Sequence, residues 1–154
     1  MDIRLRDVEP GDLPLFFEHQ RDAEAAAMAG FTSRDRPAFD EHWAKLLADD
    51  ACLKKAVLCD GQVVGNIGSW TSHGERDVGY WIDRAHWGRG VASAALSAFL
   101  ELERTRPLYA ALAKHNVASL RVLQKCGFTF VPAADDQGDN VDDSELHLVL
   151  TADI

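Results

Sequence analysis

The sequence has few cysteines and no long apolar run. Cys52, Cys59 and Cys126 include no Cys-x-x-Cys pair, so they indicate neither a disulfide framework nor a zinc site. All three lie in apolar runs, which favours buried, reduced thiols. No stretch reaches membrane-spanning length, and residues 1–6 contain no apolar signal core. We therefore expect a cytoplasmic protein that does not contact a membrane.

Basic residues are also scarce. The chain has 16 Lys and Arg against 25 Asp and Glu, a formal net charge of -9. Because nucleic-acid binding needs clustered Lys and Arg, this balance argues against a nucleic-acid partner. It suits a cationic partner such as an amine, although many soluble proteins are equally acidic. A length of 154 residues with 47% hydrophobic residues predicts one globular domain over residues 1–154.

Apolar spacing and turn signals predict alternating strands and helices. We expect a strand at 3–6, a helix capped by Asp12 that continues towards Gly30, and a second helix from Pro37. Asp60-Gly61 predicts a hairpin. The remaining expected elements are strands at 55–59, 62–67 and 77–82, a helix at 88–102, a strand at 108–112, a helix at 116–125 and strands at 128–131 and 145–150. The Asp-rich stretch 133–143 is expected to be a mobile loop. Crossover connections predict an α/β fold, with a mixed sheet of six to seven strands flanked by about four helices.

A glycine-rich turn between a strand and a helix is the most informative stretch. The strand Asp77-Val78-Gly79-Tyr80-Trp81-Ile82 is followed by Trp87-Gly88-Arg89-Gly90-Val91-Ala92 and a helix. Small residues let backbone N–H groups approach a ligand, and a helix N-terminus favours an anion. The spacing matches neither a P-loop nor the dinucleotide-binding pattern. A glycine-rich turn without a ligand is the alternative interpretation.

A second polar pair follows the next expected strand. Asn116 opens a helix, and Ser119 lies one turn later on the same face. Taken alone, Asn116 is equally an N-cap, and Gly127-Phe128 is a C-terminal cap. Together with the glycine turn, however, the pair favours a binding site.

These two segments together resemble the GNAT superfamily of acyl-CoA N-acyltransferases. The run at 79–82, the loop at 87–92 and the Asn-x-x-Ser…Gly-Phe segment are most similar to the RimJ/RimL-type branch. The resemblance implies a GNAT fold, acetyl-CoA as co-substrate and no metal. It also implies that Trp81 and Ile82 contact the pantetheine arm, as does Asn116. The residues that hold the phosphates would be Trp87, Gly88, Arg89, Gly90, Val91 and Ala92.

Acyl transfer to an amine needs a proton acceptor and stabilisation of the departing thiolate. A carboxylate at Asp77 or Glu75 would take the amine proton, directly or through water; the alternative is a solvent-exposed strand charge. By resemblance, Ser119 donates a hydrogen bond to the leaving sulfur. Many relatives use a tyrosine four residues later, where this chain has Leu123. Ala94 stands where the RimJ/RimL-like branch often has a glutamate that bears on peptide recognition.

The sequence therefore predicts an N-acetyltransferase that moves an acetyl group from acetyl-CoA directly to a primary amine. The acceptor is either a protein N-terminus or a small-molecule amine. The alternative is an acyl-CoA-binding module whose acceptor site has decayed. Acceptor-side residues are expected around Phe31, Trp43 and Trp70, all of which are otherwise core candidates. We expect a monomer or homodimer.

Overall fold

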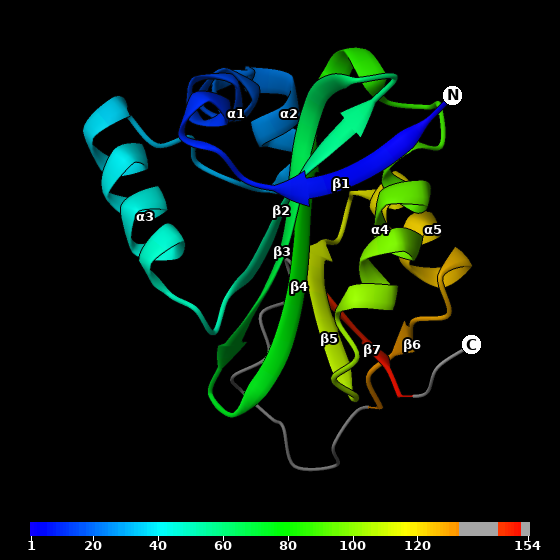
Figure 1. Cartoon of the computed structure of the whole chain (residues 1–154). Helices are drawn as coiled ribbons and strands as arrows, with labels where there is room; N and C mark the ends of the chain where they lie inside the picture. Colours follow the sequence, from blue (N-terminus) through cyan, green and yellow to red (C-terminus); the bar gives the residue numbers. More distant parts are fainter. Residues whose placement is uncertain (133–144, 152–154) are drawn as a thin grey trace.

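A computed structural model describes residues 1–132 and 145–151 of the chain, which form one sheet with helices on both faces (Figure 1). The strands are β1 (Ile3–Asp7), β2 (Leu53–Cys59), β3 (Gln62–Ser72), β4 (Glu75–Ile82), β5 (Leu108–Ala113), β6 (Thr129–Phe130) and β7 (Glu145–Leu150). The helices are α1 (Leu13–Arg21), α2 (Ala23–Ala29), α3 (Arg36–Ala48), α4 (Val91–Leu102) and α5 (Val117–Lys125), with short 3-10 turns η1 (Pro10–Asp12) and η2 (Arg84–His86). The predicted mixed α/β sheet is confirmed.

The sheet order is β1-β2-β3-β4-β5-β7-β6, and β4 and β5 are its parallel neighbours. Their pairing is short, because the register joins only Arg76 with Leu108 and Asp77 with Tyr109. Beyond these two pairs, the rest of β4 and β5 separate within the sheet. The two strands are therefore unpaired with each other towards their C-terminal ends.

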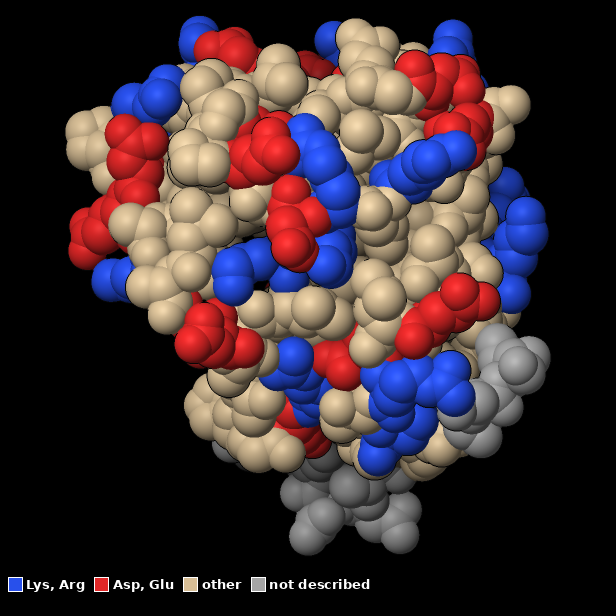
Figure 2. Space-filling view, in the orientation of Figure 1, with Lys and Arg blue, Asp and Glu red and all other residues tan. Residues whose placement is uncertain are grey.

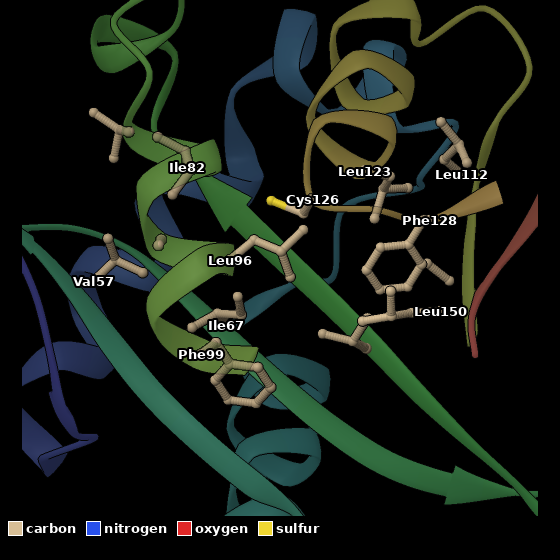
Figure 3. Close-up of a cluster of buried hydrophobic side chains, with 14 of the residues drawn as sticks. Val57, Ile67, Ile82, Leu96, Phe99, Leu112, Leu123, Cys126, Phe128 and Leu150 are labelled. Carbon is tan, nitrogen blue, oxygen red and sulfur yellow. The ribbon is translucent and has the colours of Figure 1, made fainter. Parts of the chain in front are cut away.

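The two faces of the sheet carry separate apolar cores. The larger core lies between the sheet and α4 and α5, and Figure 3 shows Leu96 and Phe99 of α4 meeting strand residues such as Ile67. The smaller core joins Phe16 of α1 and Trp43 of α3 to Ala56 of β2. Because strand side chains alternate between faces, neighbouring residues of β2 serve different cores. Figure 1 shows this division, with α1–α3 on one side and α4 and α5 on the other.

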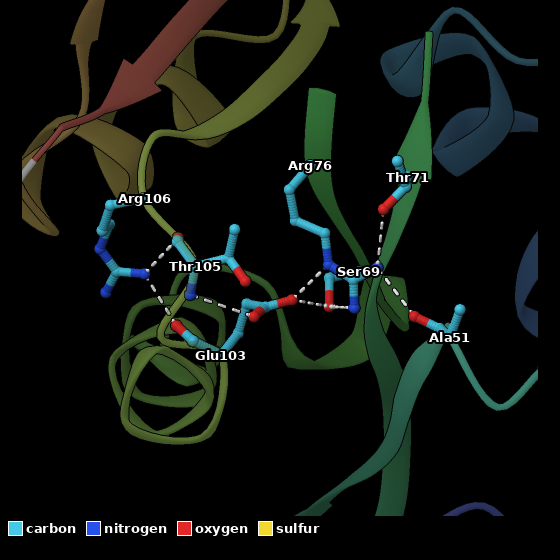
Figure 4. Close-up of polar contacts among 7 residues, drawn as sticks. All are labelled: Ala51, Ser69, Thr71, Arg76, Glu103, Thr105 and Arg106. Atoms are coloured by element: carbon cyan, nitrogen blue, oxygen red, sulfur yellow. Dashed lines mark hydrogen bonds and ion pairs between the residues drawn. The ribbon is translucent and has the colours of Figure 1, made fainter. Parts of the chain in front are cut away.

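A polar network ties the C-terminal end of α4 to the middle of the sheet (Figure 4). Glu103 follows the last turn of α4 and is 6% exposed. Its carboxylate accepts hydrogen bonds from Ser69 of β3 and Arg76 of β4. Arg76 also donates to the carbonyl oxygen of Ala51 and to Thr71. The network fixes α4 relative to the two central strands.

The N-terminal helices differ from the sequence prediction. The expected continuous helix is broken at Asp22, whose backbone is extended and whose carboxylate caps α2 by accepting from Glu24 N at 3.3 Å. Asp12 is the N-cap residue of α1 as predicted, but its carboxylate makes no capping hydrogen bond to that helix and instead accepts from Arg6 and from the backbone N–H of Glu9. Gly30 ends α2 in the left-handed conformation that glycine favours.

Later elements agree more closely with the sequence. The Asp60-Gly61 hairpin is confirmed, as are the three strands expected at 55–59, 62–67 and 77–82 (β2, β3 and β4) and β7, whereas α4 begins at Val91 rather than at Gly88. The stretch expected to be a loop, 133–143, lies outside the described residues. Cys59 and Cys126 are buried free thiols as predicted, while Cys52 is only half-buried.

Charged side chains of both signs are interspersed over the face shown in Figure 2. No broad basic area dominates that face. Within the described ranges, none of the helices has the length and apolar character that a membrane crossing requires.

Candidate active site

A cavity of about 450 Å³ lies where β4 and β5 separate. It brings together most residues of the two predicted motifs, and its surface is largely apolar. From β4 and the glycine loop it is lined by Tyr80, Trp81, Ile82, His86, Trp87, Gly88, Gly90, Val91, Ala92 and Ser93. From the segment after β5 it is lined by His115, Asn116, Val117, Ala118, Ser119, Arg121 and Val122, and from α2 by Ala25, Met28 and Ala29.

The glycine loop is shaped by two left-handed residues. Gly88 and Gly90 have φ of 76° and 80°, and a Cβ built on either would meet no atom within 4 Å. Gly90 is also the N-cap of α4, so the first N–H groups of that helix adjoin the cavity. The indole N–H of Trp87 donates to Ile82 O at 2.9 Å and fixes the ring beside the loop. The loop therefore offers open space and backbone donors, as an anionic ligand requires.

Asp83 holds the start of this loop. Its Oδ1 accepts from His86 N at 3.0 Å and lies 2.5 Å from His86 Nδ1. Because a carboxylate only accepts, the imidazole donates through Nδ1. His19 of α1 approaches the other oxygen, with Nε2 at 3.7 Å. Burial lowers the pKa of His19 although the charge of Asp83 opposes this effect, so His19 favours its neutral form.

Asn116 and Ser119 are joined as the helical spacing predicts. The side-chain oxygen of Asn116 accepts from Ser119 N at 3.2 Å, which makes Asn116 the N-cap of α5. The capping interpretation of Asn116 is therefore correct, and its side chain also lines the cavity. Position 123 holds a core leucine, 2% exposed.

Tyr80 reaches Ser119 from the opposite wall. Its hydroxyl oxygen lies 2.7 Å from Ser119 Oγ and 3.5 Å from Ser119 O. Burial raises the pKa of Tyr80 to about 12, and the hydrogen bond with Ser119 only partly offsets this effect. The phenol therefore stays protonated at neutral pH. Sequence reasoning missed this contact, because nothing in the spacing pairs position 80 with position 119.

Two side chains, those of Arg84 and His115, hold α2 beside the cavity. Arg84 pairs with Asp22 and with Glu24, at 2.5 Å and 3.0 Å. On the other side, His115 Nε2 lies 2.8 Å from Ala27 O. The wall that α2 supplies is apolar and small apart from Met28. Sequence reasoning did not place α2 here, because the helix comes from a distant, Ala-rich stretch.

The two candidate carboxylates, Asp77 and Glu75, do not line the cavity. The side chains of Val78 and Tyr80 share one face of β4 and pack towards α4 and α5. Because side chains alternate along a strand, Asp77 lies on the opposite face of the sheet. Burial, with a smaller contribution from the charge of Glu75, raises the pKa of Asp77. Arg89 does not line the cavity either.

The three aromatic residues expected on the acceptor side differ in exposure. Trp70 is 39% exposed, whereas Phe31 is half-buried and packs edge-on against Trp81 with 5.4 Å between ring centroids. Trp70 is directly cross-strand from Asp77, on the same face. Trp43 is a core residue, 7% exposed, as the alternative interpretation held. An aromatic surface beside a carboxylate is suited to a cationic group.

Metal ligands are not gathered at this site. In residues 1–132 and 145–151, no three His, Cys, Asp or Glu side chains are placed to hold an ion together. A second hollow, of about 550 Å³, lies along the other side of α4 and shares only Gly90 with the predicted site residues. The chemistry of the two motifs therefore belongs to the cavity between β4 and β5.

Comparisons with known proteins agree with this geometry. A family model described as an acetyltransferase (GNAT) domain matches residues 2–129. None of the curated proteins compared with the chain matches it.

Solved structures with the same fold include a spermidine N-acetyltransferase from Vibrio cholerae in complex with CoA and spermine (16% identity, TM-score 0.79, covering 97% of this chain and 95% of that one). Aminoglycoside acetyltransferase AAC(6')-Ib in complex with coenzyme A is similar (16%, TM-score 0.77, 97% and 95%). So is an acetyltransferase from Thermus thermophilus (22%, TM-score 0.76, 99% and 98%).

Proposed function

This chain belongs to the GNAT family of acetyltransferases, and on that premise we propose that it transfers an acetyl group directly from acetyl-CoA to a primary amine. The observation that carries the proposal is the cavity between β4 and β5, which joins the glycine loop to Asn116 and Ser119. Residues 1–154 act as one catalytic domain in this proposal.

The cavity suits both parts of acetyl-CoA. The left-handed glycines Gly88 and Gly90 and the N-terminus of α4 offer backbone donors to the phosphates. Trp81 and Ile82 lie where β4 is no longer paired with β5 and both line the cavity, which supports their proposed contact with the amide-bearing pantetheine arm. Asn116 lies beside the same path. Bound acetyl-CoA supplies a thioester carbonyl activated for attack.

Side chains of this protein then act on the departing thiolate and on the proton of the attacking amine. Ser119 donates a hydrogen bond to the departing sulfur, a role that its place in the cavity lining supports. Asp77 or Glu75 takes the proton that the amine loses, either directly or through water. The raised pKa of Asp77 makes its carboxylate a stronger base than an ordinary aspartate. Since Asp77 lies on the opposite face, the amine approaches from the α1–α3 side, through the opening between β4 and β5.

The acceptor is a cationic primary amine. The net charge of -9 attracts cations in general, and Asp77 beside the exposed ring of Trp70 offers a local site. Relatives of the same fold were crystallised with spermine and with kanamycin. The motif residues favour the RimJ/RimL-like branch, which adds protein N-termini to the candidates. The absence of a charge at Ala94 favours small amines over peptides.

An acceptor screen tests the proposal. Acetyl-CoA is incubated with spermidine, an aminoglycoside and a short peptide, and released thiol is measured. We expect turnover with at least one small amine and a rise in melting temperature with acetyl-CoA alone. Stabilisation without turnover on any amine would support the acyl-CoA-binding module instead. No stabilisation at millimolar acetyl-CoA would contradict both.

A further inference from the structure

Tyr80 and Ser119 meet at the cavity wall although they come from different layers of the fold. Tyr80 belongs to β4 and Ser119 to the first turn of α5. Their hydroxyl oxygens are 2.7 Å apart, and both side chains line the cavity. The helical position where many relatives carry a tyrosine is filled by Leu123 in the core. A phenol therefore reaches the serine from the strand rather than from the helix.

A serine hydroxyl does not hold its hydrogen in one direction unless a neighbouring group fixes it. It rotates freely about the Cβ–Oγ bond, and at a helix position it competes for nearby backbone carbonyls. A neighbour that donates to Oγ occupies one lone pair of the serine oxygen. The serine hydrogen is then directed away from that neighbour and towards another acceptor.

Building on the proposed function, we propose that Tyr80 is a positioning residue for Ser119. Its hydroxyl donates to Ser119 Oγ and turns the serine hydrogen towards the sulfur of the departing CoA. The phenol is the better donor of the pair, since a phenol is far more acidic than an aliphatic alcohol. Its burial keeps the hydrogen on Tyr80 throughout, so Tyr80 acts by hydrogen bonding and transfers no proton.

The atoms balance without a further reactant. The amine nitrogen forms a bond to the acyl carbon, and the C–S bond breaks with its electron pair remaining on sulfur. The proton that the amine loses passes through the base or solvent and finally protonates the thiolate. Ser119 stabilises the charge on sulfur during bond breaking, and Tyr80 holds Ser119 in the orientation that does so.

The test is a double-mutant cycle of Tyr80→Phe and Ser119→Ala, measured with an amine that the parent acetylates. We expect Tyr80→Phe to lower kcat by ~3- to 10-fold, the scale of one neutral hydrogen bond, with little change in the KM for acetyl-CoA. Because Tyr80 acts only through Ser119, the double variant should have the kcat of Ser119→Ala alone. Ser97→Ala is the control, since Ser97 carries an exposed hydroxyl on α4 and does not line the cavity.

Three results would overturn the inference. Parental kcat in Tyr80→Phe would show that the phenol is not needed. Multiplicative losses in the double variant would show that Tyr80 acts independently of Ser119, and parental kcat in Ser119→Ala would leave no residue for Tyr80 to position. An inactive parent with every amine, by contrast, would remove the proposed function and this inference with it. Thermal melts of each variant separate these outcomes from loss of fold.

Discussion

Glu103 Oε1 accepts a hydrogen bond from Ser69 Oγ at 2.6 Å, and this contact joins the end of α4 to the centre of the sheet. Arg76 Nε lies 2.6 Å from the same oxygen. The N-terminal end of α4 borders the candidate site through Gly90. The network therefore holds in place the helix whose other end is proposed to meet the phosphates.

We expect Glu103→Gln to destabilise the fold by about 3 kcal/mol, because it leaves the partly buried Arg76 guanidinium, 15% exposed, without its counter-charge. This corresponds to a fall of roughly 6–12 °C in melting temperature. Glu101→Gln is the matched control, since Glu101 lies on the same helix and is exposed. Equal melting temperatures for the two variants would contradict a structural role for the network.

The same network predicts a dependence of stability on pH. Burial alone would raise the pKa of Glu103, but hydrogen bonds from Ser69 and Arg76 outweigh it and lower the pKa below its ordinary 4.5. A lowered folded-state pKa means that the carboxylate contributes stability at neutral pH and loses it as pH falls below about 4.5. Urea titrations should show a smaller loss of stability over this acidic range in Glu103→Gln than in the parent. An identical slope in both proteins would argue that Glu103 is not held ionised by the fold.

Gly90 provides a test of the proposed phosphate site. Gly90→Val should abolish stabilisation by acetyl-CoA, because its Cβ would occupy the open space beside the first N–H groups of α4. The parent should gain about 2.7 kcal/mol at a ligand concentration about 100 times its Kd.

Gly61→Val controls for backbone strain in this experiment. Gly61 has φ of 83° and the same open surroundings as Gly90, but it lies in the β2–β3 hairpin away from the cavity. Both variants should lose stability, and only Gly90→Val should lose acetyl-CoA binding in calorimetry. Parental affinity in Gly90→Val would remove the loop from the binding site.

Short sequence patterns predicted those parts of the fold that depend on residues close together in the chain. The Asp60-Gly61 pair predicts a two-residue hairpin because both positions need positive φ, and both have it, at 50° and 83°. Asn116 and Ser119 are joined as their spacing predicts. The break at Asp22 was missed because an Ala-rich stretch favours helix on either side, and only the capping contact to Glu24 reveals a new start.

Contacts between residues far apart in the chain could not be predicted from short sequence patterns. The separation of β4 from β5 depends on how helices pack on both faces, and no local pattern encodes it. The contact of Tyr80 with Ser119 spans 39 positions and exists only because β4 and α5 border one opening. The opposite placement of Asp77 follows from strand alternation, but which face of β4 meets α4 and α5 becomes clear only from the packing of Tyr80 and Val78.

Asp83 should affect acetyl-CoA binding without touching the ligand. Asp83→Asn weakens the hydrogen bond from His86 Nδ1 and keeps an oxygen for the backbone N–H of His86. We expect a several-fold rise in the KM for acetyl-CoA and little change in kcat, because the loop is proposed to bind ground state and transition state alike. Steady-state kinetics measures both quantities. A fall in kcat at constant KM would contradict a role for Asp83 in holding the loop.

The choice between Asp77 and Glu75 is decided by the acidic limb of the pH profile. A general base must be ionised, so kcat/KM falls as pH drops through its pKa in the free enzyme. If Asp77 is the base, this limb lies above the ordinary aspartate value of 3.8, because burial and the charge of Glu75 raise its pKa.

Asp77→Asn should then lower kcat/KM by about 100-fold and remove the limb, since Asn cannot titrate. Glu75→Gln should instead lower the pKa of Asp77 and move the limb to lower pH, because it removes the neighbouring negative charge that raises it. Measuring parent and variants with one acceptor cancels the acceptor's own ionisation in the rate ratios. Loss of the limb in Glu75→Gln alone would make Glu75 the base. A limb retained in both variants would show that the amine proton leaves through water without either carboxylate.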